Sequence, residues 1–254
     1  MRLAKEVNRR VGRAMHDYAM LASGDSVLVA VSGGVDSLVL AWLLHWWRAK
    51  APIDYELQAV HIDMAPGEEQ QPGVAAGQVA GQLAALGVPF RSIPARWRPA
   101  DDFTPPQQSA HDICFRCARS RRNQLFDHAR QAGCNKLALG HHRDDIIETF
   151  LLNLTRSGNI STMAPRQDLF DGRLSLIRPL AYLDKQEIVT IGEQLQVTPI
   201  RPNCPLAEKT QRLEMHQLAE MIYERIPGAK KHMFAALGNV RQEYLLKQSG
   251  GRRP

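Results

Sequence analysis

The hexapeptide SGGVDS at residues 32–37 combines residue types that bind a phosphate. It lies between the β-branched apolar run 26–31 and the helical run 38–47, so backbone N–H groups at the start of a helix adjoin it. Its glycines allow close approach of the backbone, its serines add hydroxyl donors, and Asp36 suits either Mg²⁺ binding or ordering of the loop. Two glycines alone would mark only a tight turn. The loop lacks a Walker lysine, so transfer of a γ-phosphate is not indicated.

A second polar segment, LGHHRDDIIET at residues 139–149, overlaps the end of the apolar run 136–139. If that run is a parallel strand, the segment lies at its carboxyl end, where open α/β sheets bind their ligands. His141 and Asp145 are then candidates for a metal site or for catalysis. An acidic residue at the start of a helix also serves as an N-cap, and the residue types leave these roles open.

The four cysteines are too few for a disulfide framework in a chain of 254 residues. Cys114 and Cys117 form a Cys-x-x-Cys pair that suits a redox couple, half of a zinc site or part of an iron–sulfur site. Cys204, in a proline-flanked segment, is the better third ligand, whereas Cys134 precedes an apolar strand and is expected to be a buried thiol. Three thiolates would leave one iron of a 4Fe-4S cluster open, while zinc would need a fourth ligand such as His111.

Apolar runs and helical patterns alternate along the chain, which is typical of βαβ units. An edge strand is expected at 174–177, and residues 97–111 are expected to form a loop before the cysteine pair. The fold class is therefore α/β, with an open, mostly parallel Rossmann-like sheet and right-handed crossovers. Predicted strands cover 26–31, 55–62, 89–93 and 136–139, and predicted helices cover 38–47, 75–86, 118–131 and 144–154.

Further helices are predicted before and after the sheet in the sequence. An amphipathic helix covers 2–18, and later helices cover 185–194 and 213–226. We therefore divide the chain into an N-terminal helix (1–24), an α/β nucleotide-binding domain that carries the Cys-x-x-Cys loop (25–183) and a C-terminal helical region (184–254).

The composition fits a globular protein with a polyanionic partner. The formal net charge is +6, which suits RNA, and 44% hydrophobic residues are enough to fill a core. No stretch approaches the ~20 apolar residues of a membrane span, and the N-terminal residues form no apolar targeting segment. We expect a soluble, cytoplasmic protein without membrane partners.

Five motifs occur together in this chain: SGGVDS, CFRC, LALGHHRDDIIETFLLN, IRPLAY and RPNCP. In their order the chain resembles the tRNA 2-thiocytidine synthetases, a branch of the PP-loop ATP pyrophosphatase superfamily, over most of residues 5–240. The resemblance implies a tRNA sulfurtransferase that cleaves ATP to AMP and pyrophosphate, adenylates the C2 carbonyl of cytidine 32 and replaces its oxygen with sulfur. It also implies Mg²⁺, a 4Fe-4S cluster bound by three cysteines and a sulfur donor supplied by a cysteine desulfurase, and it is compatible with a homodimer.

The expected site residues fall into three groups. Mg²⁺ is expected at Asp36 and Asp145, and the cluster at Cys114, Cys117 and Cys204, which together with Asp36 form the expected catalytic set. Four arginines beside the cysteine pair are expected to contact tRNA phosphates, with a solvated helix face as the alternative for some of them: Arg116, Arg119, Arg121 and Arg122. ATP is expected to bind over Ala30, Ser32, Gly33, Gly34, Val35, Asp36, Ser37, His61, Ile62, Asp63, Gly140, His141 and Asp145.

Two features depart from the family pattern. Val35 stands where the family usually has lysine, and residues 201–203 lack the second cysteine that often precedes Cys204. The alternatives are therefore another tRNA base or an acceptor other than tRNA. A function of a different class, a non-catalytic adenine-nucleotide sensor, would make no AMP from ATP and tRNA.

Overall fold

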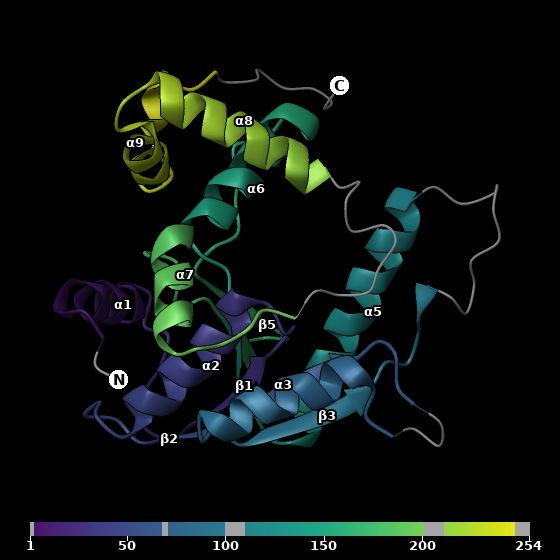
Figure 1. Ribbon diagram of the computed structural model, residues 1–254. Helices are drawn as coiled ribbons and strands as arrows, with labels where there is room; N and C mark the ends of the chain where they lie inside the picture. Colours follow the sequence, from purple (N-terminus) through teal and green to yellow (C-terminus); the bar gives the residue numbers. More distant parts are fainter. Residues whose placement is uncertain (1–2, 68–70, 100–109, 201–210, 247–254) are drawn as a thin grey trace.

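An open six-stranded sheet forms the centre of the computed structural model, which describes residues 3–67, 71–99, 110–200 and 211–246 (Figure 1). The strand order is β3-β2-β1-β4-β6-β5, and all neighbouring strands are parallel except β5 and β6. The strands are β1 (Asp25–Ala30), β2 (Tyr55–Asp63), β3 (Phe90–Pro94), β4 (Lys136–Ala138), β5 (Arg166–Leu169) and β6 (Leu174–Ile177). The helices are α1 (Lys5–Asp17), α2 (Val35–Arg48), α3 (Val74–Ala85), α5 (Ala110–Gln131), α6 (Arg143–Arg156), α7 (Lys185–Gln194), α8 (Gln211–Arg225), α9 (Ala229–Ala236) and the short η2 (Gln242–Tyr244).

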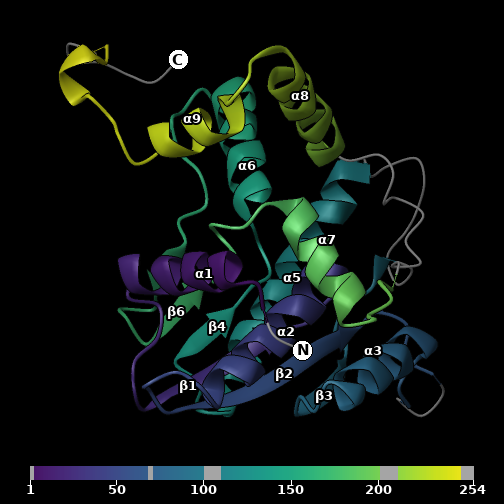
Figure 2. The ribbon, with the colours of Figure 1, turned by 60° about the vertical axis from the view of Figure 1, so that its left-hand side comes forward.

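Side chains of the central strand β1 contribute to two separate cores. Val27 and Val29 pack with helices α1, α2, α3 and α7, whereas Leu28 packs with α5. Figures 1 and 2 show α2 and α5 on opposite faces of the sheet. A strand that is buried on both faces needs apolar residues at successive positions, which explains the unbroken run of β-branched and leucine residues in β1.

The strand order reverses between β1 and β4. The chain continues from β1 to β2 and β3 on one side, while β4 lies on the other side with Ala138 in register with Val29. The carboxyl ends of β1 and β4 are therefore neighbours, and the segments 31–34 and 139–142 meet there. Open α/β sheets bind ligands at such a switch point.

The predicted fold class is confirmed, together with the strands of the parallel sheet. The prediction of an edge strand at 174–177 is wrong, because β6 pairs with β4 on one side and with β5 on the other. Strand β5 forms the edge and was not predicted. Its sequence, RQDL, is mostly polar and lacks the apolar pattern that would have indicated a strand.

Helix α5 begins earlier than predicted. It starts at Ala110 instead of Ala118, so Cys114 and Cys117 lie within a helix and not on the expected loop. Residues 110–117 contain no proline or glycine, and Ile113 is buried against the protein, so the helix extends upstream of the pair. Positions 100–109 of the expected loop lie outside the described residues.

A third core joins α6 to α8. Ile147 and Leu151 of α6 pack against Met215 and Ala219 of α8, whereas α7 packs against α2 on the sheet. The three-part division of the chain remains a prediction. Within the described ranges, the helices are too short or too polar to cross a membrane.

Two glycines provide a matched test of how closely α7 packs on α2. A Cβ atom on Gly192 of α7 would lie 2.5 Å from Cγ2 of Val35, whereas one on Gly77 of α3 would meet no atom within 4 Å. We expect Gly192→Ala to lower the free energy of unfolding by about 1–3 kcal/mol through overpacking. Gly77→Ala should raise it by about 0.5–1 kcal/mol through helix propensity. Urea denaturation measures both values, and stabilisation by both substitutions would contradict the packing.

Candidate active site

The Ser37 side chain holds the loop 32–37 in a closed turn. Its hydroxyl donates to the Gly34 carbonyl (2.8 Å) and accepts from the Ser32 N–H (3.1 Å). Helix α2 begins at Val35, and the N–H groups of Ser37 and Leu38 already donate to the Gly34 carbonyl. Among the described residues no acceptor faces the N–H groups of Val35 and Asp36, which are available to an anion at the loop. This is the arrangement that the predicted phosphate site requires.

Position 33 requires glycine for two reasons. Its φ of +92° lies in the left-handed region, and a Cβ atom would come within 3.2 Å of Ile200 and 3.3 Å of Val79. The Gly33 carbonyl also accepts from the Ile200 N–H (2.9 Å). The segment that follows α7 therefore packs directly on the loop. Cys204, four residues after Ile200, lies outside the described residues.

Gly140 brings the end of β4 against the first turn of α2. A Cβ atom on Gly140 would lie 3.0 Å from the carbonyl carbon of Asp36 and 3.1 Å from the Ser37 nitrogen. This contact places the buried imidazole of His142 near two acids, since its Nε2 lies 3.8 Å from Asp36 Oδ1 and 3.3 Å from Asp145 Oδ2. Asp36 and Asp145, the two predicted Mg²⁺ ligands, thus lie around one imidazole nitrogen.

Asp145 also has a structural role at the start of α6. Its carboxylate accepts a hydrogen bond from the His142 N–H (2.9 Å), which satisfies a backbone donor at the helix N-terminus. The N-cap residue itself is His142, so the expected N-cap role of the acid is wrong in its position, and Asp145 instead completes a capping box from the third residue of the helix. It does not compete with metal binding, because a carboxylate has two oxygens and several lone pairs.

Lys185 supplies a cation that the sequence did not predict. Its Nζ lies 2.6 Å from Oδ1 and 2.7 Å from Oδ2 of Asp36, so the ammonium group bridges both carboxylate oxygens. Lys185 begins helix α7, which also packs its Gly192 against the Val35 side chain. Val35 therefore points toward α7, and the same helix brings a lysine to the loop.

The buried acid Asp144 ties the site to the C-terminal helices. Its Oδ2 accepts from the Lys185 N–H (2.9 Å), and its Oδ1 lies 2.5 Å from Nζ of Lys230 in α9. Burial disfavours the charged form of Asp144, but the bonds from His142, Lys230 and Lys185 outweigh it and hold the pKa well below its usual range. Asp144 is therefore an ionised carboxylate that links α6, α7 and α9.

His142 and Glu148 have shifted pKa values for different reasons. Burial opposes the charged form of His142, yet Asp144, Asp145 and Asp36 together raise its pKa above the ordinary value. Burial raises the pKa of Glu148, and a hydrogen bond with His216 (2.8 Å) only partly offsets this. Shifted acids and bases beside an anion-binding loop are typical of catalytic sites.

Arg178 is a further residue that the sequence did not single out. Its side chain is buried and its Nε donates to His141 Nδ1 (3.3 Å), which orients that imidazole at the end of β4. Burial lowers the pKa of Arg178 to about 10, and the charge of Arg122 on α5 contributes to the shift. Arg122, one of the predicted tRNA contacts, therefore lies near the switch point.

Residues at the end of β2 are held by backbone groups. His61 Nδ1 lies 2.8 Å from the Val31 carbonyl, and the buried Asp63 carboxylate accepts from Gly73 N–H (2.7 Å) and Ala65 N–H (3.0 Å). Ile62 is buried and Ala30 packs beside it in the core under α5. These predicted ATP contacts shape the end of the sheet beside the loop.

The cysteine pair lies on α5. Cys114 and Cys117 are half-buried, and their spacing of one helical turn puts both thiols on one face of the helix. Cys134 is buried, as predicted. Within the described ranges, no three His, Cys, Asp or Glu side chains form a metal-binding group, but Cys204 and the His111 side chain lie outside what is described.

The predicted tRNA-binding arginines are all exposed on α5. The Arg116 guanidinium lies 5.1 Å from the centre of the Trp97 ring, so it stacks beside an aromatic side chain. Arg119, Arg121 and Arg122 occupy the following turns on the solvent side. The helix thus carries the cysteine pair and a row of positive charge together.

The loop 32–37 lies at the switch point of an open α/β sheet, a position that is typical of nucleotide-binding proteins of the PP-loop class. The family described as the PP-loop domain matches residues 3–201. Two tRNA-cytidine(32) 2-sulfurtransferases are each 36% identical to the chain. The protein from Pelobacter propionicus aligns over 97% of this chain and 90% of its own length, and that from Geobacter sulfurreducens over 95% and 92%.

A solved structure shares the fold. The U34-tRNA thiolase NcsA from Methanococcus maripaludis, with its 4Fe-4S cluster, matches with a TM-score of 0.72 at 20% identity, over 95% of this chain and 79% of that chain. The chain belongs to the PP-loop family and, within it, to the tRNA 2-thiocytidine synthetases, the tRNA-cytidine(32) 2-sulfurtransferases.

The raised pKa of His142 predicts a pH-dependent contribution to stability. A group whose pKa is raised by folding stabilises the protein fully below its unfolded value of about 6.5 and loses this effect as pH rises through the folded value. We therefore expect the difference in unfolding free energy between wild type and His142→Asn to shrink as pH rises above about 6.5. Urea denaturation at several pH values measures it, and a difference that grows with pH would contradict the assigned ion pairs.

Proposed function

We propose that this protein is an ATP-dependent tRNA sulfurtransferase that converts cytidine 32 to 2-thiocytidine. The observation that carries the proposal is the convergence of the loop 32–37 and the segment 140–145 around Asp36, in a chain that is 36% identical over nearly its whole length to relatives of that name. The likeness to a tRNA thiolase of the same fold supports it.

In this proposal the phosphates of ATP lie over the loop 32–37. The backbone N–H groups of Val35 and Asp36 would donate to phosphate oxygens as fixed donors, whose orientation costs nothing at the moment of reaction. The hydroxyls of Ser32 and Ser37 would donate to phosphate oxygens after giving up their hydrogen bonds within the loop. Asp36 and Asp145 would hold Mg²⁺, which supplies further charge stabilisation. Lys185 then exchanges its contact with Asp36 for one with the phosphates, and so replaces the lysine that the loop itself lacks.

The reaction has two steps. The cytidine O2 attacks the α-phosphorus and pyrophosphate leaves, which makes the oxygen part of a good leaving group. Sulfide then attacks C2, and AMP departs with the former cytidine oxygen. His142 lies beside Asp36 and Asp145, and their carboxylates, with that of Asp144, favour its protonated form against the effect of burial.

We assign the remaining predicted ATP contacts to the nucleoside half of ATP. The end of β2, at His61, Ile62 and Asp63, and the end of β4, at Gly140 and His141, flank the loop on its two sides. Ala30 and Val35 complete the wall of this site through main-chain atoms.

Cys114, Cys117 and Cys204 would bind a 4Fe-4S cluster. The donor set fits, because two thiols share one face of α5 and because Ile200, four residues before Cys204, donates its N–H to the Gly33 carbonyl. Three protein ligands would leave one iron open to present sulfide to the activated base. In this proposal the cysteines would bring the sulfur to the activated base.

The partners follow from the same chemistry. The arginines of α5 would contact the phosphates of the tRNA anticodon loop, and the sulfur would derive from a cysteine desulfurase in the cytoplasm. Homodimerisation remains part of the proposal. We retain the division into an N-terminal helix, an α/β domain and a C-terminal helical region as a description of chain order.

Asp36 and Lys185 are expected to be required for the first step. Asp36→Asn and Lys185→Met should each slow pyrophosphate release about 100-fold or more, because each removes charge that stabilises the transferred phosphates. Lys50→Met, at the opposite end of α2, is the control and should leave the rate unchanged. Pyrophosphate is measured with ATP, Mg²⁺ and tRNA. Wild-type rates in both site variants would remove these residues from the mechanism, and absence of AMP with the wild type would favour the nucleotide sensor.

Substitutions of Cys204 and Cys134 provide a second comparison of a test variant with a control variant. Cys204→Ala should abolish 2-thiocytidine in tRNA and lower the iron content of the purified protein, since a cluster ligand is lost. Cys134→Ala, at a buried thiol in the core, should change neither. Nucleoside mass spectrometry of tRNA from cells that carry each variant gives the answer. Retained 2-thiocytidine with Cys204→Ala would refute the ligand assignment. A different thiolated nucleoside in tRNA from the wild type would show that the acceptor is not cytidine 32.

A further inference from the structure

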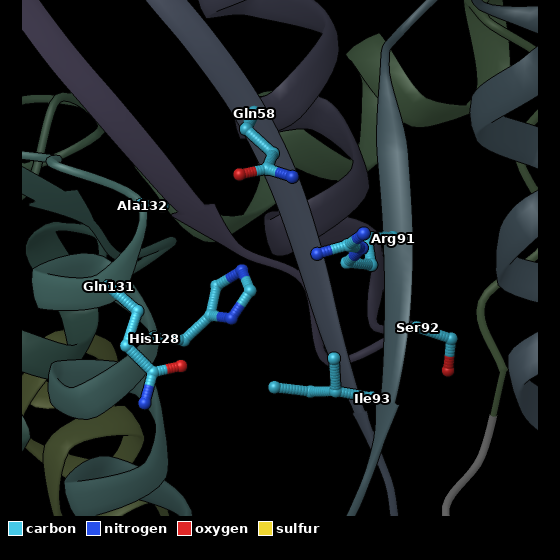
Figure 3. Close-up of a pocket in the computed structure, with 7 residues that line it drawn as sticks. All are labelled: Gln58, Arg91, Ser92, Ile93, His128, Gln131 and Ala132. Atoms are coloured by element: carbon cyan, nitrogen blue, oxygen red, sulfur yellow. The ribbon is translucent and has the colours of Figure 1, made fainter.

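A cavity of about 360 Å³ lies between β3 and the last turns of α5 (Figure 3). Gln58, Arg91 and Ile93 line one wall, and His128 and Gln131 line the other. Gln58 shares its side of β2 with Val60 and Ile62, which pack in the core under α5. The cavity therefore lies on the α5 face of the sheet, away from the loop at the switch point.

The side chains that converge on this cavity include a guanidinium, an imidazole and two amides, and none of them is acidic. In Figure 3 the Arg91 guanidinium and the His128 ring point toward the same space, and the Gln58 amide lies above them. No Asp or Glu lines the cavity, and within the described residues Arg91 has no carboxylate partner. The Nε2 atom of His128 is buried and has no hydrogen-bond partner there. An unpaired buried nitrogen beside an unpaired arginine favours an anion.

The shifted pKa of His128 is consistent with an anion site in this cavity. Burial lowers the pKa of His128, and the charge of Arg91 lowers it further. Arg91 therefore creates a positive potential at the imidazole. An anion bound between the two side chains would offset that potential and accept hydrogen bonds from both.

The position of the cavity along α5 indicates which anion it receives. His128 follows Cys117 by eleven residues of one continuous helix, which corresponds to about 16 Å at 1.5 Å per residue. Cys117 and His128 therefore lie on nearly the same face of α5, and Arg119 and Arg122 lie between them along the axis but on the solvent side of the helix. An RNA stem-loop carries a phosphate at every nucleotide, so an RNA whose reacting base lies near Cys117 has backbone phosphates at this distance.

We propose that this cavity binds a backbone phosphate of the RNA substrate, with Arg91 and His128 as its donors. The inference rests on the proposed action on tRNA. It extends the RNA-binding surface from the cysteine pair along α5 to the edge strand β3, and it makes Arg91 a binding residue outside the site of catalysis.

The test compares tRNA affinity of wild type, Arg91→Ala and Arg91→Lys between 50 and 200 mM salt. Arg91→Ala should weaken binding about 3- to 10-fold and reduce the slope of log affinity against log salt by about 1, while Arg91→Lys keeps most of the slope. Arg48→Ala is the matched control, because Arg48 is an exposed arginine at the end of α2 on the other face of the sheet. With Arg91→Ala the KM for tRNA should rise and kcat should stay unchanged.

The outcomes separate the two proposals. If wild-type protein neither binds nor thiolates tRNA, the proposed function itself fails. If the wild type binds tRNA and Arg91→Ala behaves like Arg48→Ala, the phosphate site alone is refuted. A response of the His128 imidazole signals in NMR to inorganic phosphate, combined with unchanged tRNA affinity of Arg91→Ala, would also overturn the RNA assignment, because the cavity would then be a site for a free anion.

Discussion

Close contact between the carboxyl ends of β1 and β4 is the constraint on which the candidate active site depends. Gly140 lies so near the first turn of α2 that any Cβ atom would come within 3.0 Å of the Asp36 backbone. A side chain at this position would force the two strand ends apart and move His142 and Asp145 away from the loop. Gly33 plays the same role on the opposite side, where Ile200 packs against it. The loop is therefore held between two segments that each require a glycine.

The second constraint is that positive charges from distant parts of the chain must balance the carboxylates of the site. Asp36, Asp144 and Asp145 cluster at the ends of α2 and α6, and Lys185 and Lys230 offset them from α7 and α9. A buried carboxylate is costly unless it is paired, so Asp144 makes the position of α7 and α9 a condition of folding around the site. Helix α7 also explains Val35, whose side chain meets Gly192 while Lys185 provides the positive charge. The C-terminal helices thus contribute directly to the charge balance at the loop.

The sequence was sufficient for the fold and for the two motif-bearing segments, because apolar periodicity and glycine turns are local signals. Strand β5 was not predicted because RQDL has no apolar alternation. The start of α5 was predicted too late because the prolines up to residue 106 indicate a loop, whereas residues 110–117 are compatible with a helix. Lys185 and Arg178 could not be paired with Asp36 and His141 from spacing, since these contacts join residues far apart in the chain. Arg178 does belong to the IRPLAY motif, and a buried arginine within a motif was the available signal.

The fate of one oxygen atom tests the central claim most directly, namely that ATP bound at this loop activates the cytidine carbonyl. The protein is supplied with tRNA that carries oxygen-18 at O2 of cytidine 32, together with unlabelled ATP, Mg²⁺ and a sulfide source, and the AMP is analysed by mass spectrometry. Direct attack of O2 on the α-phosphorus predicts one labelled oxygen in the AMP for each 2-thiocytidine formed. Unlabelled AMP alongside 2-thiocytidine would contradict the account, because the oxygen would then leave by a route that does not pass through an adenylated base.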